Sequence, residues 1–317
     1  MKNNLYVITS PYCRARISTS RIMWTVSAAL LPATTAAIFL FGKAAFIIIV
    51  YSIIASICTE AIIQYLSKKP ITIFDGSAFL TGLLVAFNLP PTVPWWIAVI
   101  GSVVAIGIGK QVFGGLGQNI FNPALVGRVF LMASWPHYMT NFTLPFVYDA
   151  VTSPTPLTIL KHSKSLPSVS YWDLFLGLRG GCIGEVCIAA LLLGAIVLLF
   201  LGYISLYIPL SFIATVGLLT YLFGPTGIGS GDWLFHLLSG GLILGAFFMA
   251  TDYVTSPLTK KGQIIFGIGC GIITTVIRLW GGYPEGVSYA ILIMNAVTPV
   301  IDNFTKTRIY GTNIKKE

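Results

Sequence analysis

The sequence predicts an all-α polytopic membrane protein with about ten transmembrane helices, arranged as two inverted five-helix repeats around an outer loop. Hydrophobic residues make up 56% of its 317 residues and charged residues only 9%, and the mean hydropathy is +0.85. Apolar runs recur that are long enough to cross roughly 30 Å of hydrocarbon, which takes about 20 helical residues each. They lie in equal number on the two sides of one long polar stretch. This composition excludes a soluble globular domain.

Each expected helix is an apolar run bounded by proline, glycine or charged residues. In the first half these runs are residues 22–41, 44–66, 76–89, 95–109 and 122–135. In the second half they are residues 186–202, 207–223, 234–251, 262–280 and 287–303. The expected units are a cytoplasmic segment 1–21, a first membrane repeat 22–135, an extracytoplasmic loop 136–185, a second membrane repeat 186–303 and a cytoplasmic tail 304–317.

The net charge of +9 does not indicate a nucleic-acid partner, because the basic residues lie in short loops between apolar runs. They follow the positive-inside rule, under which Lys and Arg mark the cytoplasmic ends of spans. With the N-terminus in the cytoplasm, most of the basic residues, Lys110 among them, fall on the cytoplasmic side, and Arg128 lies within an expected span. Both termini are therefore expected in the cytoplasm.

Two short segments in matching positions of the two halves suggest an internal repeat. Residues 76–91 align weakly with residues 240–255. Five spans per half is an odd number, so such repeats are inverted across the membrane, and their interface commonly holds a site. The first segment ends at Asn88 and the second at Asp252. Either these helices stop inside the membrane against protein, a cofactor or a watery cavity, or they end at its surface with ordinary polar caps.

Several polar residues are candidates for an ion path or a binding site within the membrane. Glu60 and Asp252 are costly to place in lipid and are the preferred ion-path candidates. Other acidic residues at span edges are Asp75, Glu185, Glu285 and Asp302. The alternative is that Glu60 and Asp252 cap helices or pair with Arg128 or a partner protein.

Residues 114–128 combine glycines with two asparagines between apolar runs. Close helix packing explains the glycines. It explains Asn119 and Asn122 less well, since their amides supply both donors and acceptors. The cysteines and histidines have no metal-ligand spacing, so a zinc or iron-sulfur site within this chain alone is not expected.

The outer loop contains a hydroxyl-rich turn, residues 149–157, that follows an acidic residue. Pro154 and Pro156 flank Thr155 and favour an exposed, extended backbone there, which suits a segment modified by another enzyme. Taken alone, this turn is an ordinary loop.

Four stretches of the sequence together resemble the RnfD family. They are FDGSA at residues 74–78, LPPTVPWW at 89–96, GKQVFGGLG at 109–117 and FNPA at 121–124. The resemblance covers nearly the whole chain and extends to a relative, the NqrB component of the sodium-pumping NADH:quinone reductase. It implies ten helices in two inverted repeats and a place in the bacterial cytoplasmic (inner) membrane.

The resemblance also implies a covalent flavin. The family motif D-x-x-[ST]-G-[AS]-T corresponds here to Asp149, Thr152 and Thr155, with FMN joined to Thr155 by a phosphoester bond. Ser153 replaces the motif's glycine and Pro154 its small residue. Because proline fixes φ and lacks a backbone donor, Pro154 bears on recognition by the flavin transferase.

By the same resemblance, the chain works with the iron-sulfur and flavin components of an Rnf complex, its A, B, C, E and G subunits. That complex couples electron transfer between ferredoxin and NAD to Na⁺ or H⁺ movement. A second, non-covalent flavin, riboflavin, is a further expectation. The tentative path for the ion or this second flavin comprises Glu60, Asn88, Asn119, Asn122 and Asp252.

Three alternatives remain at this stage. A flavin-free transporter or channel with the architecture of urea and ammonium channels predicts a colourless protein with unmodified Thr155. A purely structural membrane anchor predicts that Thr155→Ala leaves electron transfer intact. The equivalent component of the quinone reductase usually has a longer N-terminal extension than the one before Arg21 here.

Overall fold

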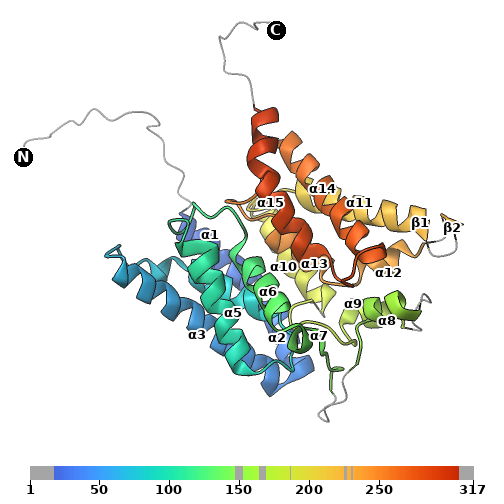
Figure 1. Ribbon diagram of the computed structural model, residues 1–317, viewed down its shortest axis with the longest axis horizontal. Coiled ribbons are helices and arrows are strands. Elements are labelled where there is room, and N and C mark those ends of the chain that lie inside the picture. The colour runs from blue at the N-terminus through green and yellow to red at the C-terminus, as the bar shows by residue number, and fades with distance from the viewer. Residues whose placement is uncertain are drawn as a thin grey trace, which may run out of the picture.

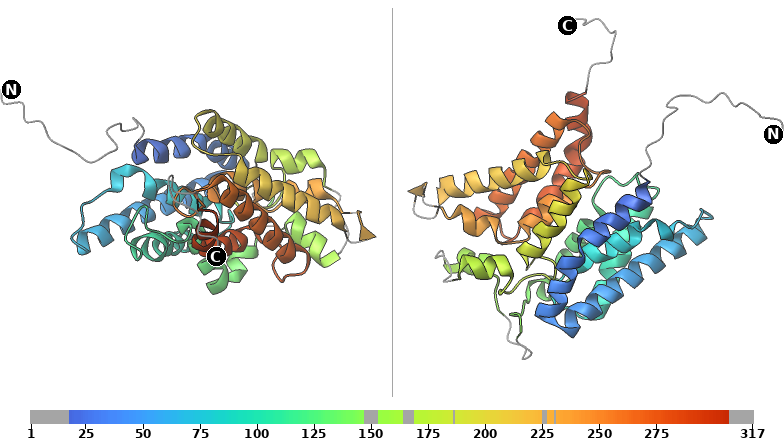
Figure 2. Two further views of the ribbon diagram at one scale, coloured as in Figure 1. Left: turned by 90° about the horizontal axis from the view of Figure 1, so that it is seen from above. Right: turned by 180° about the vertical axis from the view of Figure 1, so that it is seen from behind.

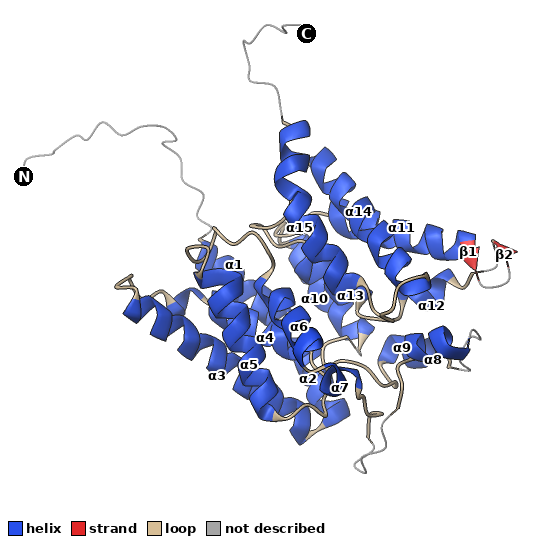
Figure 3. Ribbon diagram, in the orientation of Figure 1, coloured by secondary structure: helices blue, strands red, loops and turns tan. Residues whose placement is uncertain are grey.

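The computed structural model describes residues 18–146, 153–163, 169–185, 187–224, 227–229 and 231–306. Helices dominate, and the described strands are one short antiparallel pair, β1 (Phe223–Gly224) and β2 (Gly227–Ile228) (Figure 3). The helices form two groups that lie side by side, one from the first half of the chain and one from the second (Figures 1 and 2).

The first group contains the helices that precede the central loop. They are α1 (Thr19–Ala29), α2 (Leu31–Phe41), α3 (Lys43–Leu66), the 3₁₀ turn η1 (Ile73–Asp75), α4 (Ser77–Phe87), α5 (Trp95–Ile106), the π-helix η2 (Gly107–Gln111) and α6 (Pro123–Ser134). Pro32 in the first turn of α2 fits the break after α1, since proline suits a helix start. Gly82 lets α4 approach α3 closely, because a Cβ there would lie 2.8 Å from the Ile53 Cα.

The second group contains the remaining apolar helices. They are α10 (Ile188–Phe200), α11 (Tyr207–Leu222), α12 (Trp233–Leu237), α13 (Leu242–Leu244), the π-helix η3 (Gly245–Met249), α14 (Lys260–Leu279) and α15 (Val287–Phe304). In the sequence, the short helices α7 (Pro136–Thr140), α8 (Pro156–Ser163) and α9 (Tyr171–Leu176) come between the two groups.

Among the described residues, four helical stretches are long and apolar enough to cross a membrane: Thr19–Phe41, Lys43–Leu66, Lys260–Leu279 and Val287–Phe304. Shorter apolar helices are Ser77–Phe87, Trp95–Gln111, Pro123–Ser134, Ile188–Phe200 and Tyr207–Leu222. Large apolar side chains such as Phe39 and Phe200 are exposed on the outside of the helices, as expected for surfaces that face lipid. A polytopic helical membrane protein is therefore confirmed.

The expected continuous helix over residues 234–251 is wrong. The chain breaks there into α12, α13 and η3 around Gly240 and Gly241, which have φ values of 68° and 64°. Glycine adopts this left-handed conformation without a Cβ penalty, so the pair ends one helix and starts the next.

The carbonyl end of α4 meets protein. The Gly184 amide donates to the Phe87 carbonyl and the Ile183 amide donates to the Leu89 carbonyl, each at 2.9 Å. Asn88 between them is 1% exposed. The end of η3 is similar, because the Asn122 side-chain amide donates to the Met249 carbonyl at 3.2 Å. The carbonyls at both helix ends therefore face protein, and the depth of these ends in the membrane stays a prediction.

Candidate functional site

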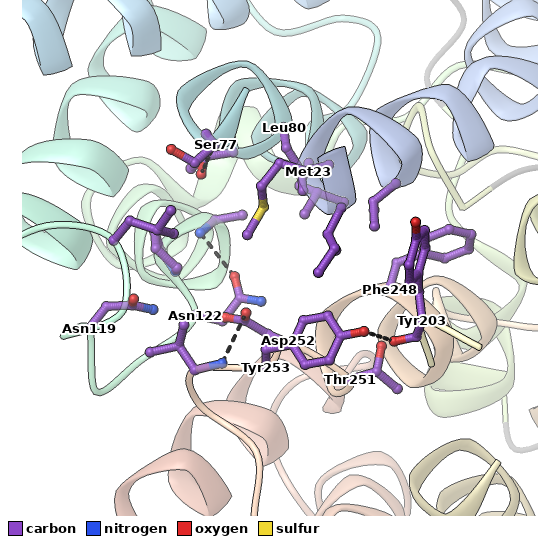
Figure 4. Close-up of a pocket in the computed structure, with 18 of the residues that line it drawn as sticks. Met23, Ser77, Leu80, Asn119, Asn122, Tyr203, Phe248, Thr251, Asp252 and Tyr253 are labelled. Carbon is purple, nitrogen blue, oxygen red and sulfur yellow. Dashed lines mark hydrogen bonds between the residues drawn. The ribbon is translucent and has the colours of Figure 1, made fainter. Parts of the chain in front are cut away.

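A cavity with about 780 Å³ of empty space, its open mouth included, lies where the two helix groups meet (Figure 4). Its walls come from α1, α4, η2 and the start of α6 in the first group, and from the end of α10, η3 and residues 251–254 in the second. Most of the lining is apolar, including Met23, Leu80 and Phe248. The polar groups that line it are Ser77, Thr81, Lys110, Asn119, Asn122, Tyr203, Thr251, Asp252 and Tyr253. An apolar pocket with a few convergent polar groups is typical of a small-molecule or cofactor site.

Three of the residues singled out from the sequence come together in this cavity: Asn119, Asn122 and Asp252. Asn122 is the N-cap of α6, where its Oδ1 accepts from the Ala124 amide at 3.0 Å. Its Nδ2 holds the end of η3, as described above, so this one side chain joins the two groups. The Asn119 Nδ2 donates to the Phe121 carbonyl at 3.1 Å.

Asp252 follows η3 and faces the cavity from the second group. Burial raises the pKa of its carboxyl, an effect opposed by hydrogen bonds from the Val254 amide and the Thr255 hydroxyl. Next to it, the Tyr253 hydroxyl donates to the Tyr203 carbonyl (Figure 4). This contact fixes one corner of the cavity.

Glu60 lies behind the cavity wall in a buried polar network. The Lys110 Nζ donates to its two carboxylate oxygens at 2.7 and 2.8 Å, and to the Ser77 hydroxyl at 2.6 Å. Gln64 and Gln111 also donate to the Glu60 carboxylate. The alternative of a Glu60–Arg128 pair is wrong, and so is the placement of Lys110 in a loop between spans, since Lys110 is 1% exposed within η2.

Asn88 belongs to a different cluster, away from the cavity. Its Oδ1 accepts from the Arg128 Nη1 at 2.6 Å, and Arg128 also pairs with Glu285 from the second group. Cys182, Glu185 and Glu285 offer ligand atoms within 4.8 Å of one another. The Arg128 guanidinium contacts both Glu285 and Cys182, so this cluster already contains a cation. The tentative path therefore divides among three places: the cavity, the Lys110 network behind its wall that contains Glu60, and the Arg128 cluster that contains Asn88.

Thr155 precedes α8 and is 3% exposed. Its Oγ1 lies 2.8 Å from the Thr158 hydroxyl and accepts from the Thr158 amide at 3.3 Å. The expectation of an exposed Thr155 is wrong, because α8 is docked: Leu157 packs on Gly240, and the Lys161 Nζ donates to the Tyr283 carbonyl at 2.7 Å. The Ser153 amide donates to the Phe142 carbonyl. Asp149 and Thr152 lie outside the described residues.

Residues 6–311 match the family described as NQR2, RnfD, RnfE. The chain belongs to this family. It is 54% identical over 317 residues to the D subunit of the Na⁺-translocating ferredoxin:NAD⁺ oxidoreductase complex of Acetobacterium woodii, covering 99% of this chain and 98% of that protein. It is 51% identical over 324 residues to the D subunit of the proton-translocating ferredoxin:NAD⁺ oxidoreductase complex of Clostridium ljungdahlii, covering 98% of each.

A more distant relative shows how far the NQR2, RnfD, RnfE resemblance extends. The D subunit of an ion-translocating oxidoreductase complex from Escherichia fergusonii is 36% identical over 346 residues, covering 96% of this chain and 98% of that protein. The assignment to the RnfD family made from the sequence motifs is confirmed.

Some of the residues that line this cavity were not singled out from the sequence. Lys110 and Ser77 lie within the motifs, but their hydrogen bond joins residues 33 apart. Tyr203 and Tyr253 sit just beyond helix ends and carry no spacing signal. The run that ends before Asp252 was an informative signal, because Asp252 lines the cavity, whereas Asn88 at the end of the other run contacts Arg128 instead.

Proposed function

We propose that this chain is the RnfD-type membrane component of an Rnf complex, in which electron transfer between ferredoxin and NAD⁺ drives Na⁺ or H⁺ across the membrane. The observation that carries the proposal is its similarity, along almost the full length of both chains, to the D subunits of two such complexes. One of these is named for Na⁺ and the other for protons, so the ion is left open. The activity requires partners, for which the resemblance names the A, B, C, E and G subunits.

FMN attached to Thr155 through a phosphoester is the proposed covalent redox group. The Thr155 hydroxyl stands at the N-terminus of α8, where backbone amides and the helix dipole favour a phosphate. The neighbouring Thr158 hydroxyl supplies a further donor. Because the Thr155 side chain is buried, the flavin transferase must act while α8 is undocked.

Riboflavin, held non-covalently, is the proposed occupant of the cavity. The cavity has a mostly apolar lining with a few convergent polar groups, the composition typical of a cofactor site. Phe247 and Phe248 offer aromatic contacts for a flat ring system, and the Asn119 amide offers polar atoms for its edge. A flavin bound there would supply one- and two-electron chemistry, while the chain binds it and sets its electrostatic surroundings.

The proposed membrane arrangement keeps ten spans in two inverted repeats, with both termini in the cytoplasm and Thr155 on the outer side. Its support is that the expected apolar runs other than 234–251 are largely helical, and that 234–251 contains α12, α13 and η3. In this arrangement α4 and the α13–η3 segment occupy matching positions of the two repeats.

In-gel fluorescence tests the covalent flavin. The chain is expressed with its flavin transferase, separated on a denaturing gel and excited with ultraviolet light. We expect a fluorescent wild-type band, no fluorescence for Thr155→Ala, and retained fluorescence for the matched control Thr158→Val. A dark wild-type band would contradict covalent attachment and favour the flavin-free channel alternative.

A further inference from the structure

The short helix α8, which begins directly after Thr155, packs beside α9 at the edge of the molecule (Figures 1 and 2). Its buried residue Leu157 belongs to a small apolar cluster with Leu174 of α9 and Phe235 of α12. This cluster is separate from the main core that joins the two helix groups. Small clusters of this kind lie under peripheral segments, and segments with few buried apolar contacts open at a lower free energy than the core.

Polar contacts hold α8 near both of its ends. Before the helix, the Ser153 amide donates to the Phe142 carbonyl at 2.8 Å. Near its other end, the Lys161 Nζ donates to the Tyr283 carbonyl at 2.7 Å and to the Ile277 carbonyl at 3.4 Å. Ile277 lies in the last turn of α14, where the helix dipole favours an ammonium group. The first contact joins backbone atoms, whereas the second depends on one partly exposed side chain.

Docking of α8 buries the start of the helix. Residues 155–157 are all buried, whereas residues 158–161 are partly exposed. Leu157 rests on Gly240, since a Cβ at that glycine would lie only 2.4 Å from the Leu157 Cδ1. Thr155 is therefore reached from solvent when α8 moves away from Gly240.

We propose that α8 covers Thr155 and opens as a unit about Ser153, and that the Lys161 contacts keep it closed. The inference rests on the proposed attachment of FMN, which requires a transferase to reach a side chain that the docked helix buries. The Thr155 hydroxyl lies 2.8 Å from the Thr158 hydroxyl of the same helix, so the two move together. Opening breaks the contacts of Lys161 and Leu157 and leaves the main core packed.

The test measures how fast a thiol at residue 155 reacts in the folded chain. Purified Thr155→Cys protein in detergent is treated with a maleimide for timed intervals, and peptide mass spectrometry quantifies the labelling of each cysteine. Cys270, which is fully buried in α14, reports unfolding of the main core in the same sample. Adding Lys161→Met should speed the labelling of residue 155 on the order of tenfold, because it removes charged hydrogen bonds. The labelling of Cys270 should stay unchanged.

Two further variants, each made in the Thr155→Cys protein, separate the role of Lys161 from a general loss of a lysine. Lys161→Arg keeps a cationic donor at the same position and should keep most of the slow labelling. Lys69→Met removes a hydrogen bond of the same kind, from a lysine to the Gly114 carbonyl in the first helix group. It should leave the labelling of residue 155 unchanged.

Three outcomes would overturn the proposal. Residue 155 could label as fast in the folded protein as in the denatured one, which would mean that α8 does not cover it. Lys161→Met could leave the labelling rate unchanged, or it could speed residues 155 and 270 together, which would mean that α8 does not open as a unit. Tenfold faster labelling in Lys161→Met together with a dark wild-type band on the denaturing gel supports the opening of α8 and rejects only the attachment of FMN.

Discussion

Lys110 and Glu60 form a salt bridge whose side chains are only 2% and 1% exposed. Desolvating two charges costs several kcal/mol per ion, and their attraction offsets this cost only when the geometry is good. Here the ammonium has three acceptors and the carboxylate has additional amide donors from Gln64 and Gln111. The pair is therefore satisfied as a unit, and removing one member leaves the other uncompensated.

Lys110→Met should destabilise the protein by about 3–5 kcal/mol, because it leaves a buried carboxylate without its partner. The double variant Lys110→Met/Glu60→Gln should regain most of that loss. Thermal unfolding in detergent measures the effect, with Lys43→Met as an exposed control. A double variant no more stable than Lys110→Met would show that the charges are not coupled.

Glu185 is a second buried acidic residue, and its ionisation should change the stability of the protein with pH. Burial, followed by the nearby Glu285, raises the pKa of its carboxyl to about 7. A folded-state pKa above the unfolded one means that the folded protein binds more protons between pH 4.5 and 7. Stability should therefore fall as the pH rises through this window.

The melting temperature of the wild type should decrease from about pH 5 to about pH 7.5 more steeply than that of Glu185→Gln, which cannot ionise. Scanning calorimetry or a thiol-independent dye assay measures both curves. Equal slopes for the two proteins would mean that Glu185 does not control the pH dependence.

Single site residues could be predicted from the sequence where their residue type is unusual for its surroundings. Asn119 and Asn122 stood out because packing does not require amides, and both line the cavity. The burial of Lys110 was not predicted, because the positive-inside rule counts charge without knowing its partner. That partner, Glu60, is 50 residues away and is brought near by the packing of α3 against η2.

At the scale of elements, the contact of α3 with α4 depends on the absence of a side chain at Gly82. A Cβ there would lie 2.8 Å from the Ser52 carbonyl oxygen and from the Ile53 Cα, so one helix would have to move. Gly107 is different, because its nearest neighbour would be the Ile63 Cδ1 at 3.7 Å. A methyl group added at residue 82 therefore meets the backbone of a neighbouring helix, whereas one added at residue 107 meets only a side chain at ordinary contact distance.

Gly82→Ala should destabilise the protein by about 1–3 kcal/mol through overpacking, whereas Gly107→Ala should leave its stability nearly unchanged. Both melting temperatures in detergent can be compared with that of the wild type. Equal melting temperatures for the two variants would show that α3 and α4 can separate without cost.

Element boundaries followed from the sequence where hydrophobicity changed sharply. The run 76–89 contains α4, and 95–109 covers most of α5 and η2. The breaks within apolar runs were not predicted. The turn after α1, the π-helices and the interruption at Gly240 and Gly241 depend on backbone geometry that leaves the hydrophobic pattern unchanged.

For the whole molecule, the proposed topology predicts which surfaces face the cytoplasm. Lys68 follows α3 and His137 lies in α7, and both side chains are exposed. In intact cells, a membrane-impermeant maleimide should label His137→Cys but not Lys68→Cys, while permeabilised cells should label both. The reverse pattern would invert the protein, and labelling of both in intact cells would contradict the span assignment between them.

The cavity walls belong to two helix groups, so a molecule bound there contacts both groups and stabilises their association. By mass action, an occupant present at about a hundred times its dissociation constant adds about 2.7 kcal/mol to the stability of the joined state. Dilution during detergent extraction removes that contribution. The fraction of protein that survives extraction is then a report on occupancy, and adding the occupant to the buffers becomes a rational way to preserve the protein.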